Sequence, residues 1–214
     1  MPKIAPSMLS ADFLHLERDV EMVNGCADLF HLDIMDGVFV PNISYGFPVV
    51  EAIAAKAALP LDAHLMIVHP EKYVERFARA GASMISFHAE TVDDPDSLLS
   101  KIRSLGVKAG LAFNPDWPVE KVFPYLKSCD FILVMSVFAG FGGQKFIPET
   151  WSRLDALKSE IARQGADCLI EVDGGVSPDN ASRLSAAGAD ILVAGSAVFK
   201  SPDPSSTVFR MKNA

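Results

Sequence analysis

The sequence has few cysteines and no long apolar segment. Its three cysteines, Cys26, Cys129 and Cys168, are widely spaced and form no CxxC pair, which excludes a disulfide framework and a zinc ribbon. The longest apolar run, residues 131–141, is too short to cross a bilayer. No signal-peptide pattern precedes the first apolar run. We therefore expect a reduced, cytoplasmic protein with no membrane partner.

Basic residues are also in the minority. Lys and Arg number 19 against 27 Asp and Glu, which gives a net charge of -8. This balance argues against binding to nucleic acid or to an anionic membrane surface, although backbone amides can still bind a small anion. What the chain has in quantity is apolar residues, at 50% of 214. That composition predicts a soluble globular protein with a sizeable core.

Short apolar runs recur along the chain and alternate with amphipathic helical patterns. The expected strands span residues 3–9, 29–35, 60–66, 84–88, 107–112, 131–137, 168–172 and 191–194. Strands that alternate with helices indicate a parallel sheet. Eight repeats favour a closed (β/α)₈ TIM barrel over an open doubly wound sheet. Because no linker or low-complexity segment interrupts the pattern, we expect one domain over residues 1–214.

The stretch FHLDIMDG, residues 30–37, carries polar side chains inside an apolar strand. Because side chains alternate along a strand, His31 and Asp33 share one face and the apolar residues between them share the other. A barrel strand has one face on the helices and one on the barrel interior. We therefore expect the imidazole and the carboxylate to lie inside the barrel, near its C-terminal mouth.

Two other strand ends carry the same kind of polar residue. The strand at 60–66 contains His64, and Asp173 follows the strand at 168–172 just before a Gly-Gly turn. The carboxyl ends of barrel strands meet at one mouth, where the active sites of this fold lie. Together with the first pair, they give two imidazoles and two carboxylates, a set that suits Zn²⁺, Fe²⁺ or Mn²⁺. A hydrogen-bonded network without metal is the alternative.

Glycine-rich turns predict a phosphate site and a lid. DGGVS (173–177) and VAGSAVF (193–199) follow the last two strands, where this fold usually binds phosphate. Small residues let an anion approach backbone N–H groups at a helix N-terminus. AGFGGQKF (139–146) follows the sixth strand, and its three glycines favour a mobile lid over an ordinary surface loop.

Seven stretches of the chain resemble the ribulose-phosphate 3-epimerase family. They are IAPSMLSADF, HLDIMDGVFVPNISYG, DAHLMI, SFHAE, GFGGQKF, EVDGGVS and VAGSAVF, and they extend from Ile4 to Phe199 in the family's order. The resemblance implies a (β/α)₈ barrel and an isomerase of the pentose phosphate pathway. The implied reaction interconverts D-ribulose 5-phosphate and D-xylulose 5-phosphate.

The resemblance also implies roles for individual residues. His31, Asp33, His64 and Asp173 would hold a divalent metal ion (Zn²⁺, Fe²⁺, Mn²⁺ or Co²⁺), and Asp33 and Asp173 would be the acid/base pair. The residues implied in substrate contact are Ser7, His64, Gly140, Phe141, Gly142, Gly143, Gly174, Gly175, Gly195 and Ser196. The implied partner is a small-molecule ketose phosphate, and we expect a homo-oligomer.

The dipeptide Phe138-Ala139 departs from the family pattern, which usually has a proline directly before the GFGG segment. The loop thereby loses a φ restraint and gains an aromatic side chain at the mouth. Two other functions stay open: a 3-epimerase for another ketose phosphate, such as D-allulose 6-phosphate, and a non-catalytic sugar-phosphate-binding barrel. A related decarboxylase is disfavoured because the strand that contains Asp33 has no lysine.

Overall fold

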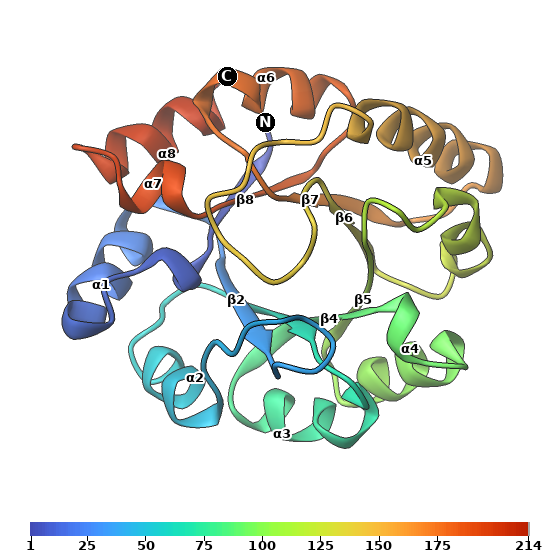
Figure 1. Cartoon of the computed structure of the whole chain (residues 1–214), viewed down its shortest axis with the longest axis horizontal. Coiled ribbons are helices and arrows are strands. Elements are labelled where there is room, and N and C mark those ends of the chain that lie inside the picture. The colour runs from blue at the N-terminus through green and yellow to red at the C-terminus, as the bar shows by residue number, and fades with distance from the viewer. Residues whose placement is uncertain (214) are drawn as a thin grey trace.

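The computed structural model describes residues 1–213 and contains a barrel of eight parallel strands surrounded by helices (Figure 1). The strands are β1 (Lys3–Pro6), β2 (Phe30–Met35), β3 (Leu61–Met66), β4 (Ala82–His88), β5 (Lys108–Phe113), β6 (Phe131–Met135), β7 (Leu169–Asp173) and β8 (Ile191–Ala194). Their order around the sheet follows the chain, with β1 beside β8. The predicted (β/α)₈ barrel is confirmed, and the last residue of the expected 1–214 domain lies outside the described residues.

The junction of β1 and β2 closes the barrel with fewer bonds than the other junctions. An isolated bridge joins Ser7 to His31, and the backbone N–H of Asp28 donates to the carbonyl of Ile4 at 3.0 Å. Strand β1 ends earlier than predicted because Met8–Ser10 forms a 3₁₀ helix, η1. This early end leaves Ser7 at the mouth, next to β2.

The α-helices lie on the outside of the barrel. They are α1 (Leu16–Cys26), α2 (Phe47–Ala54), α3 (Val74–Arg79), α4 (Pro95–Ser104), α5 (Thr150–Gln164), α6 (Pro178–Ala186), α7 (Ser196–Phe199) and α8 (Pro204–Lys212). The further 3₁₀ helices are η2 (Phe13–His15), η3 (Pro70–Lys72), η4 (Ala89–Thr91) and η5 (Val119–Tyr125). After β5, η5 takes the place of the expected α-helix, and it contains Pro124, which lacks an N–H donor. No helix within residues 1–213 has the length and apolarity of a membrane span.

The core has an apolar shell and a partly polar interior. The larger apolar cluster lies between strands and helices and includes the fully buried Leu32 and Phe87. A smaller cluster inside the barrel contains Phe131 and Ile191, which begin their strands. Gly110 makes room for the Phe131 ring, because a Cβ atom there would overlap it.

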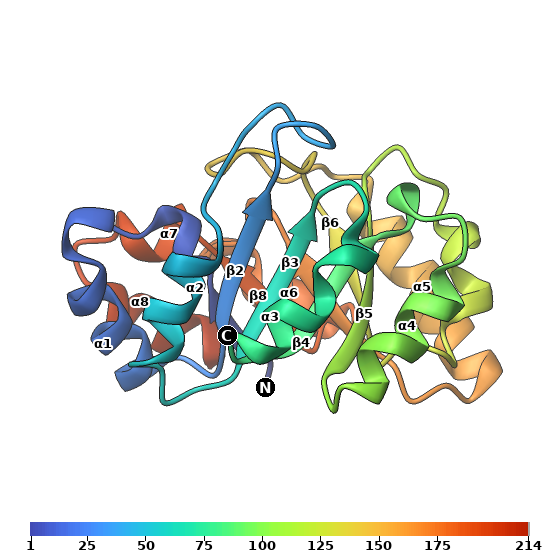
Figure 2. The same ribbon diagram turned by 90° about the horizontal axis from the view of Figure 1, so that it is seen from below.

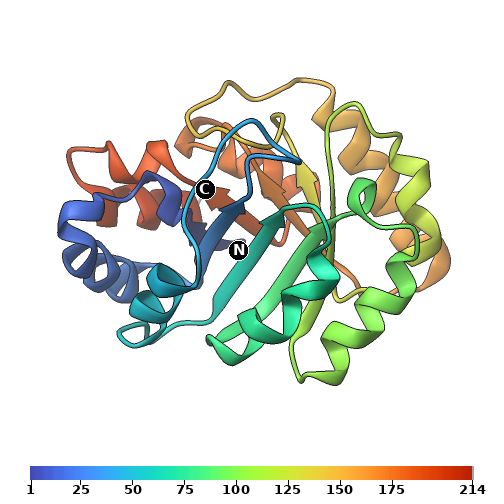
Figure 3. The same ribbon diagram turned by 60° about the horizontal axis from the view of Figure 1, so that its bottom comes forward.

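Two loops extend beyond the carboxyl ends of the strands. Figure 2 shows the barrel from the side, with the loops after β2 (36–46) and after β6 (136–149) above the strand ends. The N-terminus lies at the opposite end, and the view in Figure 3 shows the same two loops close together. Seen down the barrel, the loop after β6 crosses over the interior (Figure 1). The two loops therefore frame the mouth that the sequence predicts to be functional.

Candidate active site

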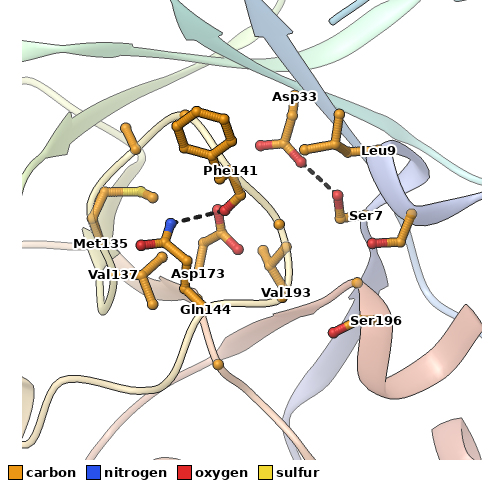
Figure 4. Close-up of a pocket in the computed structure, with 18 of the residues that line it drawn as sticks. Ser7, Leu9, Asp33, Met135, Val137, Phe141, Gln144, Asp173, Val193 and Ser196 are labelled. Carbon is orange, nitrogen blue, oxygen red and sulfur yellow. Dashed lines mark hydrogen bonds between the residues drawn. The ribbon is translucent and has the colours of Figure 1, made fainter. Parts of the chain in front are cut away.

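A pocket lies beneath these loops at the carboxyl ends of the strands (Figure 4). Its walls include Ser7 and Asp33 from one side, Asp173 from β7, and the lid residues 137–144. The space left between these walls is about 60 Å³.

Four polar side chains converge below the pocket: Asp33 and Asp173 line it, whereas His31 and His64 are fully buried beside them. Nε2 of His31 lies 3.3 Å from Oδ1 of Asp33 and 4.0 Å from Oδ2 of Asp173. Nδ1 of His64 lies 3.2 Å and 4.0 Å from the same two oxygens. The four ligand atoms lie within 4.8 Å of one another. The structure thus brings together all four residues that the sequence singles out as metal ligands.

The geometry of this cluster fits a divalent cation. With bonds of 2.0–2.2 Å, two ligands of a tetrahedral ion lie about 3.4 Å apart, close to the separations seen here. Nε2 of His31 is buried and makes no hydrogen bond to any of residues 1–213. An orphaned imidazole nitrogen that faces two carboxylates has the donor chemistry of a metal site.

The cluster separates the acidities of its two carboxyl groups. Burial would raise the pKa of Asp33, but the imidazoles of His31 and His64 hold that pKa well below its usual range. Burial, reinforced by the charge of Asp33, raises the pKa of Asp173 to about 7. In the metal-free protein near neutral pH, Asp33 is therefore ionised while Asp173 is about half protonated.

The pKa values of the two histidines are also shifted in opposite directions. Burial opposes protonation of His31, but the carboxylates of Asp33 and Asp62 raise its pKa well above the usual range. Burial lowers the pKa of His64 to about 4, so this imidazole is neutral. Nδ1 of His31 lies 2.6 Å from Oδ2 of Asp62, which fixes a proton on that nitrogen. Nε2 of His31 is therefore the nitrogen that faces the cluster.

The turns predicted to bind phosphate also line the pocket. Gly174 and Gly175 have φ angles of 119° and 61°, which favour glycine. A Cβ atom on Gly175 would overlap the backbone nitrogen of Phe146 at the base of the lid. Gly195 and Ser196, which begin α7, line the same pocket. The structure brings these four residues and Ser7 around one space (Figure 4).

A capping box at the start of α6 fixes the turn after β7. The Ser177 side chain accepts from the N–H of Asp179, and the Asn180 side chain accepts from the N–H of Ser177. The amide group of Asn180 also donates to the carbonyl of Gly175 at 3.0 Å. These contacts hold the Gly-Gly turn against the pocket, as the sequence signal Ser177-Pro178 indicates.

The lid is held by side chains on both sides of it. Gln144 donates from Nε2 to the carbonyls of Phe138 at 2.7 Å and Phe141 at 2.8 Å, which folds the lid on itself (Figure 4). Asn42, in the loop after β2, donates to the carbonyl of Gly140 at 2.8 Å. All four predicted lid contacts, Gly140 to Gly143, line the pocket. The phenyl ring of Phe141 lies over the pocket but is half exposed.

Sequence reasoning missed three polar residues that organise the mouth. Asn42 and Gln144 lie in loops, where no periodicity marks a side chain that returns to the lid. Asn114 accepts from the backbone N–H of Ala139 at the lid base, at 3.0 Å. Because Asn114 directly follows β5 and other site residues also lie at strand ends, its position in the sequence already places it at the mouth.

Together, the fold and the site define a TIM-barrel protein with a candidate metal centre and glycine-rich turns at its mouth. The model of the ribulose-phosphate 3 epimerase family matches residues 3–199, and the chain belongs to this family. The family prediction is therefore confirmed, and so is the prediction of an enzyme of the isomerase class.

Curated relatives named ribulose-phosphate 3-epimerase match almost the whole chain. The relative from Synechocystis sp. is 47% identical over 214 residues, covering 99% of this chain and 93% of its own. Those from Mycobacterium tuberculosis and Bacillus subtilis are 44% and 43% identical and cover 92% and 100% of their own lengths, with 99% and 100% of this chain. The similarity therefore extends over the strands that carry all the candidate site residues.

Solved structures with little sequence identity share the fold. KGPDC from Streptococcus mutans superposes with a TM-score of 0.73 at 14% identity, covering 100% of this chain and 96% of its own. The 3-hexulose-6-phosphate synthase from Salmonella typhimurium gives 0.70 at 17% identity, covering 99% and 97%. These likenesses show the TIM barrel alone.

Proposed function

We propose that the chain interconverts D-ribulose 5-phosphate and D-xylulose 5-phosphate by proton transfer at C3, in the pentose phosphate pathway. Family membership and the relatives' names support the reaction. The observation that carries the site assignment is the convergence of His31, Asp33, His64 and Asp173, of which the two aspartates line the mouth pocket.

The same four residues would hold a divalent ion, Zn²⁺, Fe²⁺, Mn²⁺ or Co²⁺, through imidazole nitrogens and carboxylate oxygens. When bound, the ion supplies a Lewis acid that stabilises negative charge on the C2 oxygen of the sugar. Asp62 supports this arrangement, because it accepts the proton on Nδ1 of His31, so that Nε2 is the nitrogen that would release its proton and bind the ion.

Asp33 and Asp173 are the proposed acid/base pair. They reach the pocket from β2 and β7, which are not neighbours in the barrel, and both side chains face the same space (Figure 4). An ionised carboxylate on one side of C3 removes the proton, and a protonated carboxyl on the other side returns one. Ser7 donates from Oγ to Oδ2 of Asp33, which orients that carboxylate. The reverse reaction exchanges the two roles.

The phosphate group is proposed to bind the backbone N–H groups of the turns at Gly174–Gly175 and Gly195–Ser196. Holding the phosphate there limits the orientation of the sugar above the two aspartates. Met35, Met66 and Met135 form apolar walls that exclude water from the reacting carbon. Because residues 137–144 of the lid line the pocket above the two aspartates, we expect the lid to move when a ketose phosphate enters.

A coupled epimerase assay after chelation and metal add-back tests the proposal. We expect turnover of D-ribulose 5-phosphate that falls on chelation and returns with one or more of the four cations. Saturable binding of the substrate without turnover, whichever cation is added, would instead favour the non-catalytic sugar-phosphate-binding barrel.

A 3-epimerase for another ketose phosphate is the second candidate. The half-exposed Phe138, part of the dipeptide that departs from the family pattern, lines the pocket. We expect the apolar contact of the Phe138 ring to change the relative kcat/KM for ketose phosphates of different chain length. A panel of ketose phosphates that includes D-allulose 6-phosphate ranks these candidates by kcat/KM.

A further inference from the structure

A buried histidine and a glutamate lie behind His64, on the side away from the metal-ligand cluster. Nε2 of His64 lies 2.9 Å from Nε2 of His88, the last residue of β4. Nδ1 of His88 in turn lies 3.4 Å from Oε2 of Glu90, which η4 places directly after that strand. Both histidines are fully buried, and the Glu90 side chain is 14% exposed. The three side chains form a line that leads from the cluster into the protein.

The donor and acceptor roles along this line follow from which ring nitrogens carry protons. Two ring nitrogens 2.9 Å apart form a hydrogen bond only if one carries a proton and the other a lone pair. A carboxylate can only accept, so Glu90 favours the proton of His88 on Nδ1. Nε2 of His88 is then the acceptor, and His64 must donate from its own Nε2. Nδ1 of His64 is left with a lone pair that faces Oδ1 of Asp33 at 3.2 Å, so in the metal-free protein Glu90 and Asp33 favour opposite tautomers of His64.

We propose that Glu90, acting through His88, is a positioning residue that holds His64 in the tautomer whose Nδ1 lone pair faces the candidate metal cluster. The proposal rests on the metal site of the proposed function. Nδ1 of His88 and Oε2 of Glu90 are both buried, and neither has a hydrogen-bond partner elsewhere in residues 1–213. Their separation of 3.4 Å closes to a standard hydrogen bond with a small side-chain movement.

The other oxygen of Glu90, Oε1, also accepts a hydrogen bond, so both oxygens of a carboxylate are needed at this position. Oε1 accepts from the backbone N–H of Asn114 at 2.8 Å, and the Asn114 side chain holds the N–H of Ala139 at the lid base. Both oxygens of Glu90 therefore face donors. A glutamine in its place can accept at only one end, so its amide group faces either His88 or the Asn114 N–H. Glu90→Gln must weaken one of these two contacts.

The chain contains a matched pair that controls for the substitution. His69 and Glu71 also bring Nδ1 and a carboxylate oxygen to 3.4 Å, but their side chains are 64% and 44% exposed. Their pair lies outside the cluster of metal ligands. Glu71→Gln therefore makes the same chemical change at a solvated histidine, and we expect it to leave His64 and the cluster unaffected.

The first measurement is made on the metal-free protein. Long-range ¹H–¹⁵N NMR of the histidine rings reports which nitrogen of His64 carries the proton. We expect a larger Nε2–H population in the parent chain and in Glu71→Gln than in Glu90→Gln, in which Asp33 draws the proton to Nδ1. The second measurement is titration with Co²⁺ or Zn²⁺, for which Glu90→Gln should weaken affinity about 10- to 100-fold, as for other outer partners of metal-bound histidines.

Two variants of His88 test whether this residue transmits the effect of Glu90 to His64. His88→Gln offers an amide oxygen to Nε2–H of His64 and should retain the parent tautomer, whereas His88→Met offers no comparable acceptor and should lose it. If Glu90→Gln fails to fold, the comparison of His88→Gln with His88→Met still tests whether an acceptor at position 88 sets the tautomer of His64. Parent-like tautomer and affinity in both Glu90→Gln and His88→Met would overturn the proposal. A parent chain that shows the Nε2–H tautomer but binds no metal would instead refute the metal site.

Discussion

Asp33 and Asp173 face one pocket but have different neighbours. The Ser7 hydroxyl donates to Asp33 and Nδ1 of His64 lies 3.2 Å from Oδ1 of Asp33, whereas the Asp173 side chain is 17% exposed and lies 4.0 Å from the nearest imidazole nitrogens. Asp33 is thus the more firmly oriented carboxylate. This difference predicts that the two groups can be separated by substitution even though both would bind the same ion.

We expect Asp173→Asn to lower turnover at least about 100-fold, the lower range for loss of one general acid/base group. Asp33 would still remove and return a proton on its own side of C3. The variant should therefore exchange solvent deuterium into one epimer without inversion, and Asp33→Asn should do so in the other. NMR of the sugar and the turnover rate measure both effects.

Metal content serves as the control, because the substitution also removes a candidate ligand. A metal-loaded Asp173→Asn protein that epimerises at nearly the parent rate would contradict the two-base assignment.

Gly175 and Gly165 provide a second residue-level comparison. Their φ angles are 61° and 62°, but a Cβ on Gly175 would overlap the backbone of Phe146. A Cβ on Gly165 would meet no atom of residues 1–213 within 4 Å apart from its own chain neighbours. We expect Gly165→Ala to cost about 1–2 kcal/mol of stability, the cost of the left-handed conformation, with KM unchanged. Gly175→Ala should cost more and also raise KM, because it displaces the lid base and the proposed phosphate turn. Thermal unfolding and steady-state kinetics test this, and equal KM values for the two variants would contradict the phosphate assignment.

The elements at the mouth were predictable to different degrees. The period-2 pattern at His31 and Asp33 predicts the inward face of β2, and strand ends that meet at one mouth bring in His64 and Asp173. The line from His64 to Glu90 is not predictable in this way, because it depends on the register of β3 against β4, which shifts between Leu61 and Asp62. Contacts between loops distant in sequence are harder still, as Asn42 and the lid show.

At the level of the lid, we expect Gln144→Ala to raise KM several-fold while changing the melting temperature little. The Gln144 side chain is partly buried at the pocket, outside the apolar core, and donates two hydrogen bonds to lid carbonyls. Its loss therefore loosens the lid without opening the core. Faster amide hydrogen exchange at residues 138–143 is the accompanying sign. Gln164→Ala is the matched control, since Gln164 also donates to a backbone carbonyl, that of Phe123, but far from the pocket. An equal rise in KM for both variants would contradict a role for Gln144 in the lid.

In the whole molecule, four of the exposed apolar side chains lie at the same end of the barrel as its polar interior. Val38 and Ile43, in the loop after β2, are 72% and 74% exposed, and Phe138 and Phe141 of the lid are half exposed. Apolar side chains gathered beside a mouth are typical of surfaces that bind another molecule. The homo-oligomer stays a prediction. It is tested by comparing the molar mass of the protein in solution with the mass of one chain.

The buried cluster links metal binding to the stability of the whole chain. Folding buries His31, Asp33 and His64 almost completely, so the folded state holds preformed ligands that the unfolded chain lacks. A ligand that binds only the folded state at 100 times its Kd adds about 2.7 kcal/mol. For a chain of this length, each kcal/mol raises the melting temperature by roughly 2–4 °C.

We therefore expect saturating divalent metal to raise the melting temperature by roughly 5–10 °C over the chelated protein. His31→Gln should lose most of this shift, because it replaces an imidazole ligand, whereas His69→Gln should retain it, because His69 lies on the surface outside the cluster. Differential scanning calorimetry with and without each cation measures the shifts. An equal shift in the parent chain and in His31→Gln would show that the stabilising ion binds elsewhere, and the assignment of the mouth cluster as the metal site would then be wrong.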